Sequence, residues 1–168
     1  NRMAKAVRAG PALATSAMRD AENGPEFRDF LQERFGIDAR TISGDEEARL
    51  IYMAVRDATD LRDRQSLIVD VGGGSTELIV GDAVSMRHAE SLPLGVLRLN
   101  AQFDGTQPMR AKGRKALRTH VRAVIDEMVR KAHAAAVRRV IGTAGTVSAM
   151  ARVLLAEEGI VTEGDAPS

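Results

Sequence analysis

The segment from Leu67 to Asp82, LIVDVGGGSTELIVGD, constrains the fold more than any other part of the sequence. Two apolar runs typical of strands flank three consecutive glycines, and an acidic residue lies near the end of one run and near the start of the next. Glycine weakens a strand and often marks a place where a ligand or another backbone approaches closely. The pattern therefore predicts a hairpin whose turn lies against a closely approaching group.

Two familiar phosphate-binding loops do not fit this segment. A P-loop needs Gly-Lys-Ser/Thr at the start of a helix, and DVGGGSTE contains no lysine. A dinucleotide-binding loop is followed at once by a helix, whereas STELIVG has the composition of a strand. An ordinary tight hairpin, for which two glycines suffice, is the structural alternative.

The acidic residues beside the glycines favour a phosphate-binding turn. The backbone N–H groups of Gly72, Gly73 and Gly74 are expected to bind phosphate oxygens. Asp70 and Glu77, on either side of the turn, are expected to hold a divalent cation, because Mg²⁺ prefers carboxylate and phosphate oxygens. The sequence thus predicts a joint phosphate and Mg²⁺ site at the hairpin.

Three further places are candidates for functional residues, each with an ordinary structural alternative. Glu47 shares a helix face with apolar residues, so it is either a general base facing a cleft or a first-turn glutamate favoured by the helix dipole. Arg19 is either a phosphate clamp or a surface residue. The loop GTAGT either presents N–H groups to an anion or allows close strand–helix packing. Its candidate residues are Gly142, Thr143, Gly145 and Thr146.

The remaining pattern predicts a chain of alternating helices and strands. Strands are expected at 13–18, 37–42, 67–71, 77–81, 84–99 with interruptions, and 137–142. Helices are expected at 1–10, between Asn23 and Gly36, from Ser43 to about residue 57, around Leu117–Met128, and at 146–158. The polar segment 61–66 indicates a linker or a domain boundary.

Composition and charge narrow the class of protein. The 168 residues include no cysteine, which excludes disulfides and thiolate metal sites, and no apolar stretch approaches the ~20 residues of a membrane span. With no secretory pattern at the N-terminus, a cytoplasmic protein is predicted. Basic residues dominate from Met109 to Val140, which indicates either a solvated helix face or a surface that attracts polyanions. The histidines have no metal-ligand spacing.

Five motifs in this order resemble the Ppx/GppA phosphatase family of exopolyphosphatases and guanosine pentaphosphate phosphohydrolases. They are ATSAMRDAENG, SGDEEARLIY, LIVDVGGGSTELIVG, SLPLGVLRL and IGTAGTVSAMA, and they run from about Ala12 to Arg152. The resemblance implies the α/β, RNase H-like fold of the actin, sugar-kinase and Hsp70 superfamily, with a mixed β-sheet and two domains around a cleft. It places the later part of domain I in residues 1–60 and most of domain II in residues 64–168.

The same resemblance implies an activity and roles for the candidate residues. The activity is removal of the terminal phosphate from inorganic polyphosphate or pppGpp by Mg²⁺-assisted attack of water. Glu47 would be the general base and Asp70 and Glu77 the metal ligands, while Arg19 and Ser75 would join the glycines in binding phosphate. No nucleic acid or membrane partner is implied, and a homodimer is allowed.

Two alternative functions stay open. Members of the family begin with another strand and a phosphate loop of the DxGTNS type, and this sequence contains neither. We therefore expect a piece of a longer protein, and a non-catalytic polyphosphate- or nucleotide-binding protein is one alternative. An ATP-dependent kinase of the same superfamily is the other, although such kinases usually use an aspartate as the base.

Overall fold

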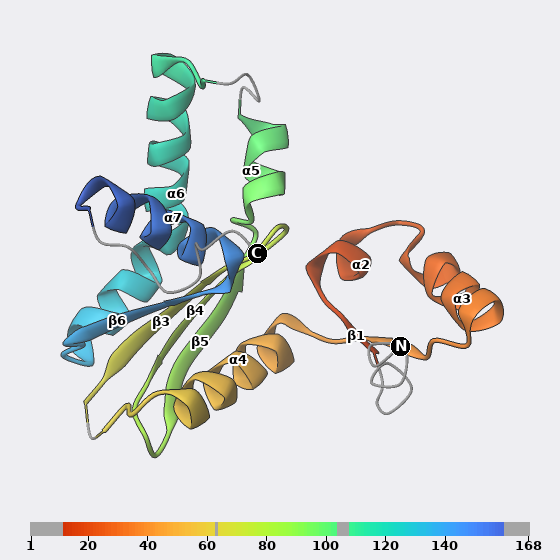
Figure 1. Cartoon of the computed structure of the whole chain (residues 1–168), viewed down its shortest axis with the longest axis horizontal. Coiled ribbons are helices and arrows are strands. Elements are labelled where there is room, and N and C mark those ends of the chain that lie inside the picture. The colour runs from red at the N-terminus through yellow and green to blue at the C-terminus, as the bar shows by residue number, and fades with distance from the viewer. Residues whose placement is uncertain (1–11, 63, 104–107, 160–168) are drawn as a thin grey trace. The chain divides into compact units, whose positions relative to one another are not determined.

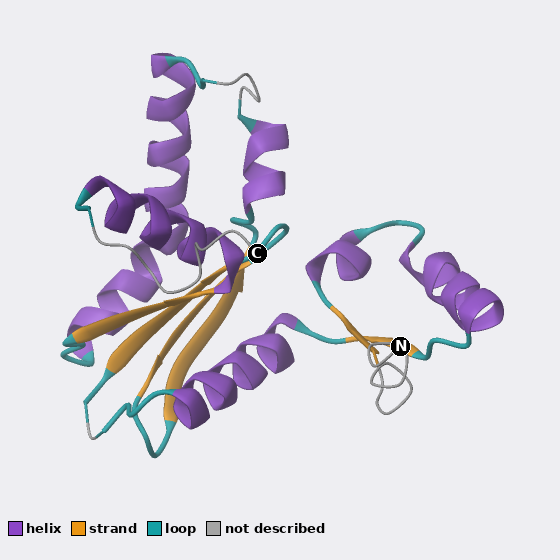
Figure 2. Cartoon of the chain, in the orientation of Figure 1, coloured by secondary structure: helices purple, strands orange, loops and turns teal. Residues whose placement is uncertain are grey.

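A computed structural model of the chain describes residues 12–62, 64–103 and 108–159 (Figure 1). The chain divides into two compact units, Asn1–Glu47 and Ala48–Ser168, and each contains helices and strands (Figure 2). The helix expected at residues 1–10 lies outside the described residues. No helix within the described ranges is long and apolar enough to cross a membrane.

The first unit contains two short parallel strands with two helices between them. These elements are β1 (Ala12–Ala14), α2 (Ser16–Asp20), α3 (Gly24–Phe35) and β2 (Ala39–Thr41). Pro25 lies in the first turn of α3, and Gly36 closes the helix with a φ of 65°, in the left-handed region. The helix expected between Asn23 and Gly36 is confirmed, although the Asn23 side chain makes no capping hydrogen bond.

The strand expected at residues 13–18 is wrong in its second half. From Ser16 onwards the chain forms α2, and the N–H groups of Met18 and Arg19 both donate to the carbonyl oxygen of Thr15. Alanine and methionine are good helix formers, and this propensity prevails over a short apolar run that lacks strict alternation.

Helix α4 (Gly44–Ala58) starts as the sequence predicts. The N–H of Glu46 donates to Ser43 Oγ at 3.1 Å, which satisfies one of the free N–H groups of the first turn. The boundary between the two compact units falls within this helix, between Glu47 and Ala48. The predicted domain limits, 1–60 and 64–168, rest on the resemblance rather than on packing, and they stay a prediction.

The second unit is built on a four-stranded mixed sheet. Its strands are β3 (Ser66–Val71), β4 (Thr76–Gly81), β5 (Met86–Leu92) and β6 (Arg139–Thr143), in the order β5-β4-β3-β6. β3 is antiparallel to β4 and parallel to β6, and β4 is antiparallel to β5. The loops that follow the parallel strands β3 and β6 therefore lie at one edge of the sheet, where ligands usually bind in open α/β sheets.

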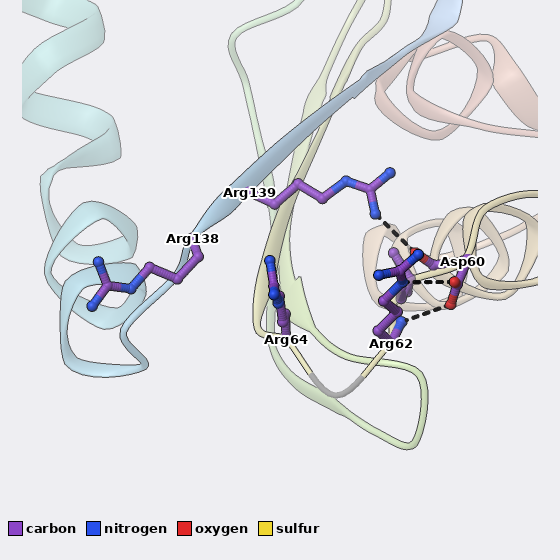
Figure 3. A pocket seen from close by; sticks show the side chains of 6 residues that line it. Asp60, Arg62, Arg64, Arg138 and Arg139 are labelled. Atoms are coloured by element: carbon purple, nitrogen blue, oxygen red, sulfur yellow. Dashed lines mark hydrogen bonds and ion pairs between the residues drawn. The ribbon is translucent and has the colours of Figure 1, made fainter.

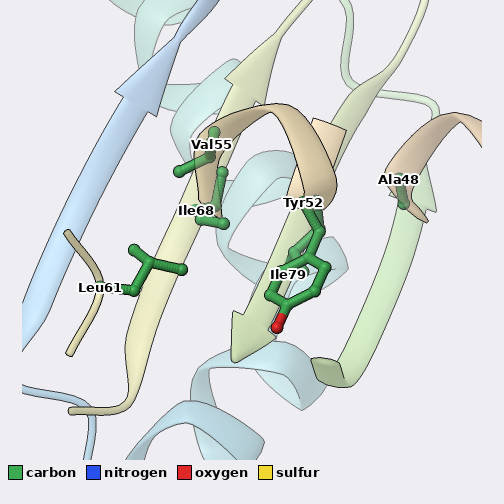
Figure 4. Close-up of a cluster of buried hydrophobic side chains, with 6 residues drawn as sticks. All are labelled: Ala48, Tyr52, Val55, Leu61, Ile68 and Ile79. Carbon is green, nitrogen blue, oxygen red and sulfur yellow. The ribbon is translucent and has the colours of Figure 1, made fainter. Parts of the chain in front are cut away.

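Helices cover both faces of this sheet. On one face, α4 packs against Ile68 and Ile79 (Figure 4). On the other face, Leu78 and Val80 pack against Met128 of α6 (Ala111–Ala134). Alternate residues of β4 thus face opposite helices, as the period of a strand requires. Helix α7 (Ala144–Glu157) follows β6 and contacts β3.

Residues 96–102 form a helix, so the prediction of a strand as far as residue 99 is wrong. β5 ends at Leu92, and α5 (Val96–Gln102) begins directly after Gly95. The apolar residues of VLRL suit a strand as well as a helix, but the N–H groups of Val96 and Leu97 donate to two carbonyl oxygens of the glycine turn. These contacts satisfy the free N–H groups of a first helical turn and so stabilise the helix.

Candidate functional site

A hairpin follows the DVGGGS segment, and that prediction is confirmed. β3 and β4 are joined by a tight turn in which the N–H of Gly72 donates to the carbonyl oxygen of Ser75 at 3.0 Å. The register places Asp70 directly opposite Glu77. Side chains of directly opposite residues lie on the same face, with Cβ atoms about 4.5–5.5 Å apart, so this spacing suits a cation shared by the two carboxylates.

Asp70 and Glu77 belong to a polar row that crosses the whole sheet. The register aligns Ser91 of β5, Glu77 of β4, Asp70 of β3 and Thr143 of β6. The Ser91 hydroxyl donates to Glu77 Oε1 at 2.7 Å, and the Thr143 hydroxyl donates to Asp70 Oδ2 at 2.6 Å. Each carboxylate is therefore oriented by a hydroxyl from a neighbouring strand.

Glu77 is a fully buried acidic residue within the polar row. Only 1% of the Glu77 surface is exposed. A buried carboxylate is unfavourable unless hydrogen bonds or a cation compensate its charge. The Ser91 hydroxyl supplies one hydrogen bond. Ser91 was not among the predicted site residues, because only the strand pairing reveals its position beside Glu77.

Close approach constrains the turn on both sides, most strongly at Gly95: a Cβ on Gly72 or Gly73 would stand 3.2–3.3 Å from its nearest neighbour, the Ser75 carbonyl oxygen or Leu97 Cδ1. Gly72 and Gly73 do not have positive φ angles, so their backbone angles do not demand glycine. Gly95 lies against the peptide that joins Gly73 to Gly74, and a Cβ on Gly95 would stand 2.3 Å from the Gly73 carbonyl oxygen. On this side of the turn, the closely approaching group is the chain's own Gly95.

The first turn of α5 sets the direction of the peptides in the glycine turn. The Val96 N–H donates to the Gly72 carbonyl oxygen at 3.0 Å, and the Leu97 N–H donates to that of Gly73 at 2.9 Å. In a planar trans peptide, the C=O and the following N–H point in opposite directions. The N–H groups of Gly73 and Gly74 therefore point away from α5, and neither has a backbone acceptor among the described residues. Successive N–H groups of this kind form anion-binding concavities.

The GTAGT segment, predicted as a loop, is not one: Gly142 and Thr143 end β6, and α7 begins directly at Ala144, at the same edge of the sheet as Asp70. Thr143 is the N-cap residue of α7, but its hydroxyl donates to Asp70 rather than to the helix. Gly145 and Thr146 lie in the first turn of α7, where free N–H groups and the helix dipole favour anions. A Cβ on Gly145 would meet no atom within 4 Å, so the fold leaves space there.

The alternative role, close packing of strand and helix, applies to Gly142, which lies in β6. A Cβ on Gly142 would stand 2.4 Å from Val147 Cγ1, so its absence lets α7 pack closely on β6.

Ala144, the first residue of α7, has a φ of 67°, which is uncommon for a residue other than glycine. Backbone strain of this kind concentrates at functional sites.

In the first unit, two predicted site residues form an ion pair. Arg19 Nη1 lies 3.3 Å from Glu47 Oε2 and also donates to the Ile42 carbonyl oxygen at 3.0 Å. The side chains of Arg19 and Glu47 are 25% and 15% exposed. The neighbouring Glu46 instead pairs with Arg40. The structure thus distinguishes Glu47 from Glu46 as the carboxylate that accompanies Arg19.

Asp70 and Glu77 are a pair of candidate metal ligands rather than a complete set. Within the described part of the chain, no group of three or more His, Cys, Asp or Glu side chains is placed to hold a metal ion. Mg²⁺ in phosphate-handling proteins is commonly bound by one or two carboxylates together with substrate phosphates. The donor set therefore fits Mg²⁺ that binds together with a phosphate.

A cavity of about 420 Å³ lies near the residues at which β3 and β6 begin (Figure 3). Its lining residues are Asp60, Leu61, Arg62, Arg64, Arg138 and Arg139. Arg62 Nε donates to Asp60 Oδ2 at 2.8 Å, and this hydrogen bond lowers the pKa of the Asp60 carboxyl. Asp70 and Thr143 lie at the opposite ends of their strands, so this cavity is separate from the polar row.

Known proteins share the sequence pattern and the fold of the chain. The model of the Ppx/GppA phosphatase family matches residues 6–166. A solved exopolyphosphatase from Cytophaga hutchinsonii is 29% identical, with a TM-score of 0.84. The match covers 93% of this chain and 49% of that protein.

Two further solved structures give similar matches. An exopolyphosphatase-like protein is 32% identical with a TM-score of 0.80, and the match covers 92% of this chain and 52% of that protein. The Aquifex aeolicus PPX-GPPA enzyme is 26% identical with a TM-score of 0.67, covering 89% of this chain and 47% of that enzyme. The chain spans about half the length of the solved proteins that it matches.

Proposed function

The chain belongs to the Ppx/GppA phosphatase family, and on this premise we propose that the protein hydrolyses the terminal phosphoanhydride bond of inorganic polyphosphate or pppGpp. Its fold is the mixed α/β, RNase H-like fold of the actin-like superfamily that the family resemblance implies. One solved protein of similar structure is named an exopolyphosphatase and another exopolyphosphatase-like, which makes polyphosphate the first substrate to test.

The polar row beside the glycine turn is the observation that carries the proposal. The N–H groups of Gly73 and Gly74 offer positive partial charge to phosphate oxygens, while Asp70 and Glu77 offer negative charge to a cation. An ordinary hairpin requires neither a buried carboxylate nor successive N–H groups turned away from a neighbouring helix, as those of the glycine turn are from α5. The combination supports a site for a phosphate group accompanied by a metal ion.

Asp70 and Glu77 are the residues that we propose as ligands of Mg²⁺. When bound, such a cation neutralises phosphate charge and stabilises the charge that develops on phosphoryl oxygens. The hydroxyl groups of Thr143 and Ser91 keep both carboxylates oriented before the ion binds. Outer hydrogen bonds of this kind are common around metal ligands and raise metal affinity.

Glu47 is proposed as the general base, with Arg19 as its partner. A water oxygen attacks the terminal phosphorus, and the bond from this phosphorus to the bridging oxygen breaks. The water proton passes to a carboxylate oxygen of Glu47. The ion pair with Arg19 holds that carboxylate in one orientation. Arg19 Nε also lies 3.8 Å from Asp20 Oδ1, and the Nη2 N–H groups suit a phosphate oxygen.

Phosphate release tests this function directly. With Mg²⁺, the full-length protein is expected to release inorganic phosphate from polyphosphate or pppGpp faster than from ATP and without an added acceptor. Phosphate transfer from ATP to a sugar hydroxyl, without net phosphate release, would identify a kinase instead. Polyphosphate binding with no release would identify a non-catalytic binding protein.

The basic face of α6 is predicted to contribute to binding of long substrates. Arg114, Arg118 and Arg122 are exposed and spaced by four residues, so they lie along one side of the helix. Replacing all three with glutamate should weaken the binding of long polyphosphate and flatten its dependence on salt, because fewer phosphate contacts release counterions. Titrations at several salt concentrations measure both effects.

The nucleotide substrate provides the comparison for this variant. pppGpp carries only short phosphate chains, so its affinity should change little when the α6 charges are reversed. Equal affinity and an equal salt slope for long polyphosphate in the wild type and the triple variant would identify the basic face as a solvated surface.

A further inference from the structure

Arg98 of α5 lies against the glycine turn, and we infer that it is a positioning residue for the N–H groups of this turn. The inference rests on the proposed function, since it concerns the turn that binds phosphate there. The Arg98 side chain is partly buried, and its Nε donates to the Gly74 carbonyl oxygen at 2.9 Å. Arg98 thus acts on the site through a peptide group of the turn.

The Arg98 side chain extends a set of contacts that the α5 backbone begins. The N–H groups of Val96 and Leu97 hold the carbonyl oxygens of Gly72 and Gly73. The backbone N–H of Arg98 lies 3.4 Å from the Gly73 carbonyl oxygen, so the Gly74 carbonyl is left to the side chain. Donors of α5 therefore hold three consecutive carbonyl groups of the turn.

The contact with Gly74 determines where the N–H of Ser75 points. The peptide that joins Gly74 to Ser75 directs its C=O toward Arg98, so its N–H faces the opposite side. This N–H joins those of Gly73 and Gly74 in a series of three that face away from α5. Glycine restricts its backbone angles very little, so without Arg98 this peptide can rotate and withdraw its N–H group.

Arg98 also strengthens the donors that it positions. A charged donor makes a stronger hydrogen bond than a neutral one, and it polarises the peptide group that accepts it. The N–H of the same peptide becomes a better donor to an anion on the other side of the turn. We therefore expect Arg98 on the C=O side of the Gly74–Ser75 peptide and the phosphate on its N–H side.

Replacing Arg98 with methionine tests this inference, because methionine keeps an apolar stem and removes the donor. The ¹⁵N-labelled protein is titrated with inorganic tripolyphosphate, and the amide signals of Gly73, Gly74 and Ser75 are followed by NMR. In the wild type, all three signals should shift and saturate. In Arg98→Met, the apparent dissociation constant should rise roughly tenfold, as for the loss of a charged hydrogen bond. The Ser75 signal should lose its response.

Two further variants separate positioning from charge. Arg138→Met removes the same charge from an exposed side chain just before β6, and it should leave the titration unchanged. Arg98→Lys keeps the charge but lacks Nε, so the Ser75 signal should already differ from the wild-type position before any anion is added. The remaining signals of each spectrum report whether the variant is folded.

An unchanged dissociation constant and an unchanged Ser75 response in folded Arg98→Met would overturn the inference while leaving the phosphate-binding role of the turn intact. If the amide signals of Gly73, Gly74 and Ser75 in the wild type do not shift when tripolyphosphate is added, both the proposed function and the inference are contradicted.

Discussion

Replacing Glu47 with glutamine is expected to lower the turnover of polyphosphate by roughly 10²–10⁴-fold, the usual contribution of general acid–base catalysis. Glutamine has nearly the same shape and keeps an oxygen for the hydrogen bond from Arg19, but it cannot accept the proton of the attacking water. Substrate binding should therefore remain close to that of the wild type. Phosphate release and polyphosphate binding, both measured with the full-length protein, separate the two effects.

The adjacent Glu46 provides a matched control for this substitution. Its carboxylate pairs with Arg40, and only its backbone N–H takes part in the start of α4. Glu46→Gln should therefore leave turnover near the wild-type level. Turnover in Glu47→Gln that equals that of Glu46→Gln would show that the general base is another residue.

Replacing Gly95 with alanine should destabilise the protein by about 1–3 kcal/mol, the usual effect of adding atoms to a packed site. The backbone angles of Gly95, φ −70° and ψ 149°, are open to any residue, so the effect comes from space alone. The added Cβ would stand 2.3 Å from the Gly73 carbonyl oxygen and from the Gly74 carbonyl carbon. Urea unfolding measures the change in the free energy of unfolding.

Displacement of the glycine turn is the second expected consequence. The N–H groups of Val96 and Leu97 should exchange faster with solvent, because their acceptors on the turn move away. Gly145→Ala is the control for stability, since the new Cβ would meet no atom within 4 Å. A Gly95→Ala variant as stable as Gly145→Ala, with unchanged exchange at Val96, would contradict the close packing of α5 on the turn.

Local patterns were sufficient to predict the hairpin and most of the helices and strands. Two apolar runs are separated by the glycine turn, and this pattern predicted the ends of β3 and β4 to within one residue. Ser43 and Gly36 act within one turn of their own helices, so their roles are visible in the sequence. Asp70 and Glu77 were predicted to share a cation because they flank the glycine turn, and the observed hairpin register places them opposite each other.

Contacts between distant segments account for what the sequence analysis missed. The first turn of α5 is stabilised by carbonyl groups of a turn more than twenty residues earlier, and no local pattern contains that information. Ser91 meets Glu77 only through the pairing of β4 with β5. Arg98 reaches Gly74 from the helix that was predicted as a strand, so its role could not be inferred.

The motifs, rather than physical patterns, led to the pairing of the two candidates in the first unit. Arg19 and Glu47 are 28 positions apart, and each has an ordinary surface explanation when considered alone. The family resemblance assigned both to one site. Their ion pair is consistent with that assignment, although their roles in catalysis stay a prediction.

A crystal structure with Mg²⁺ and a non-hydrolysable imido analogue of tripolyphosphate tests the central claim most directly. The ion is expected about 2.0–2.1 Å from carboxylate oxygens of Asp70 and Glu77. Terminal phosphate oxygens are expected about 2.7–3.2 Å from the backbone nitrogens of Gly73, Gly74 and Ser75. Binding of the analogue and the ion at another place, with no contact to the glycine turn, Asp70 or Glu77, would contradict a joint phosphate and Mg²⁺ site at this hairpin.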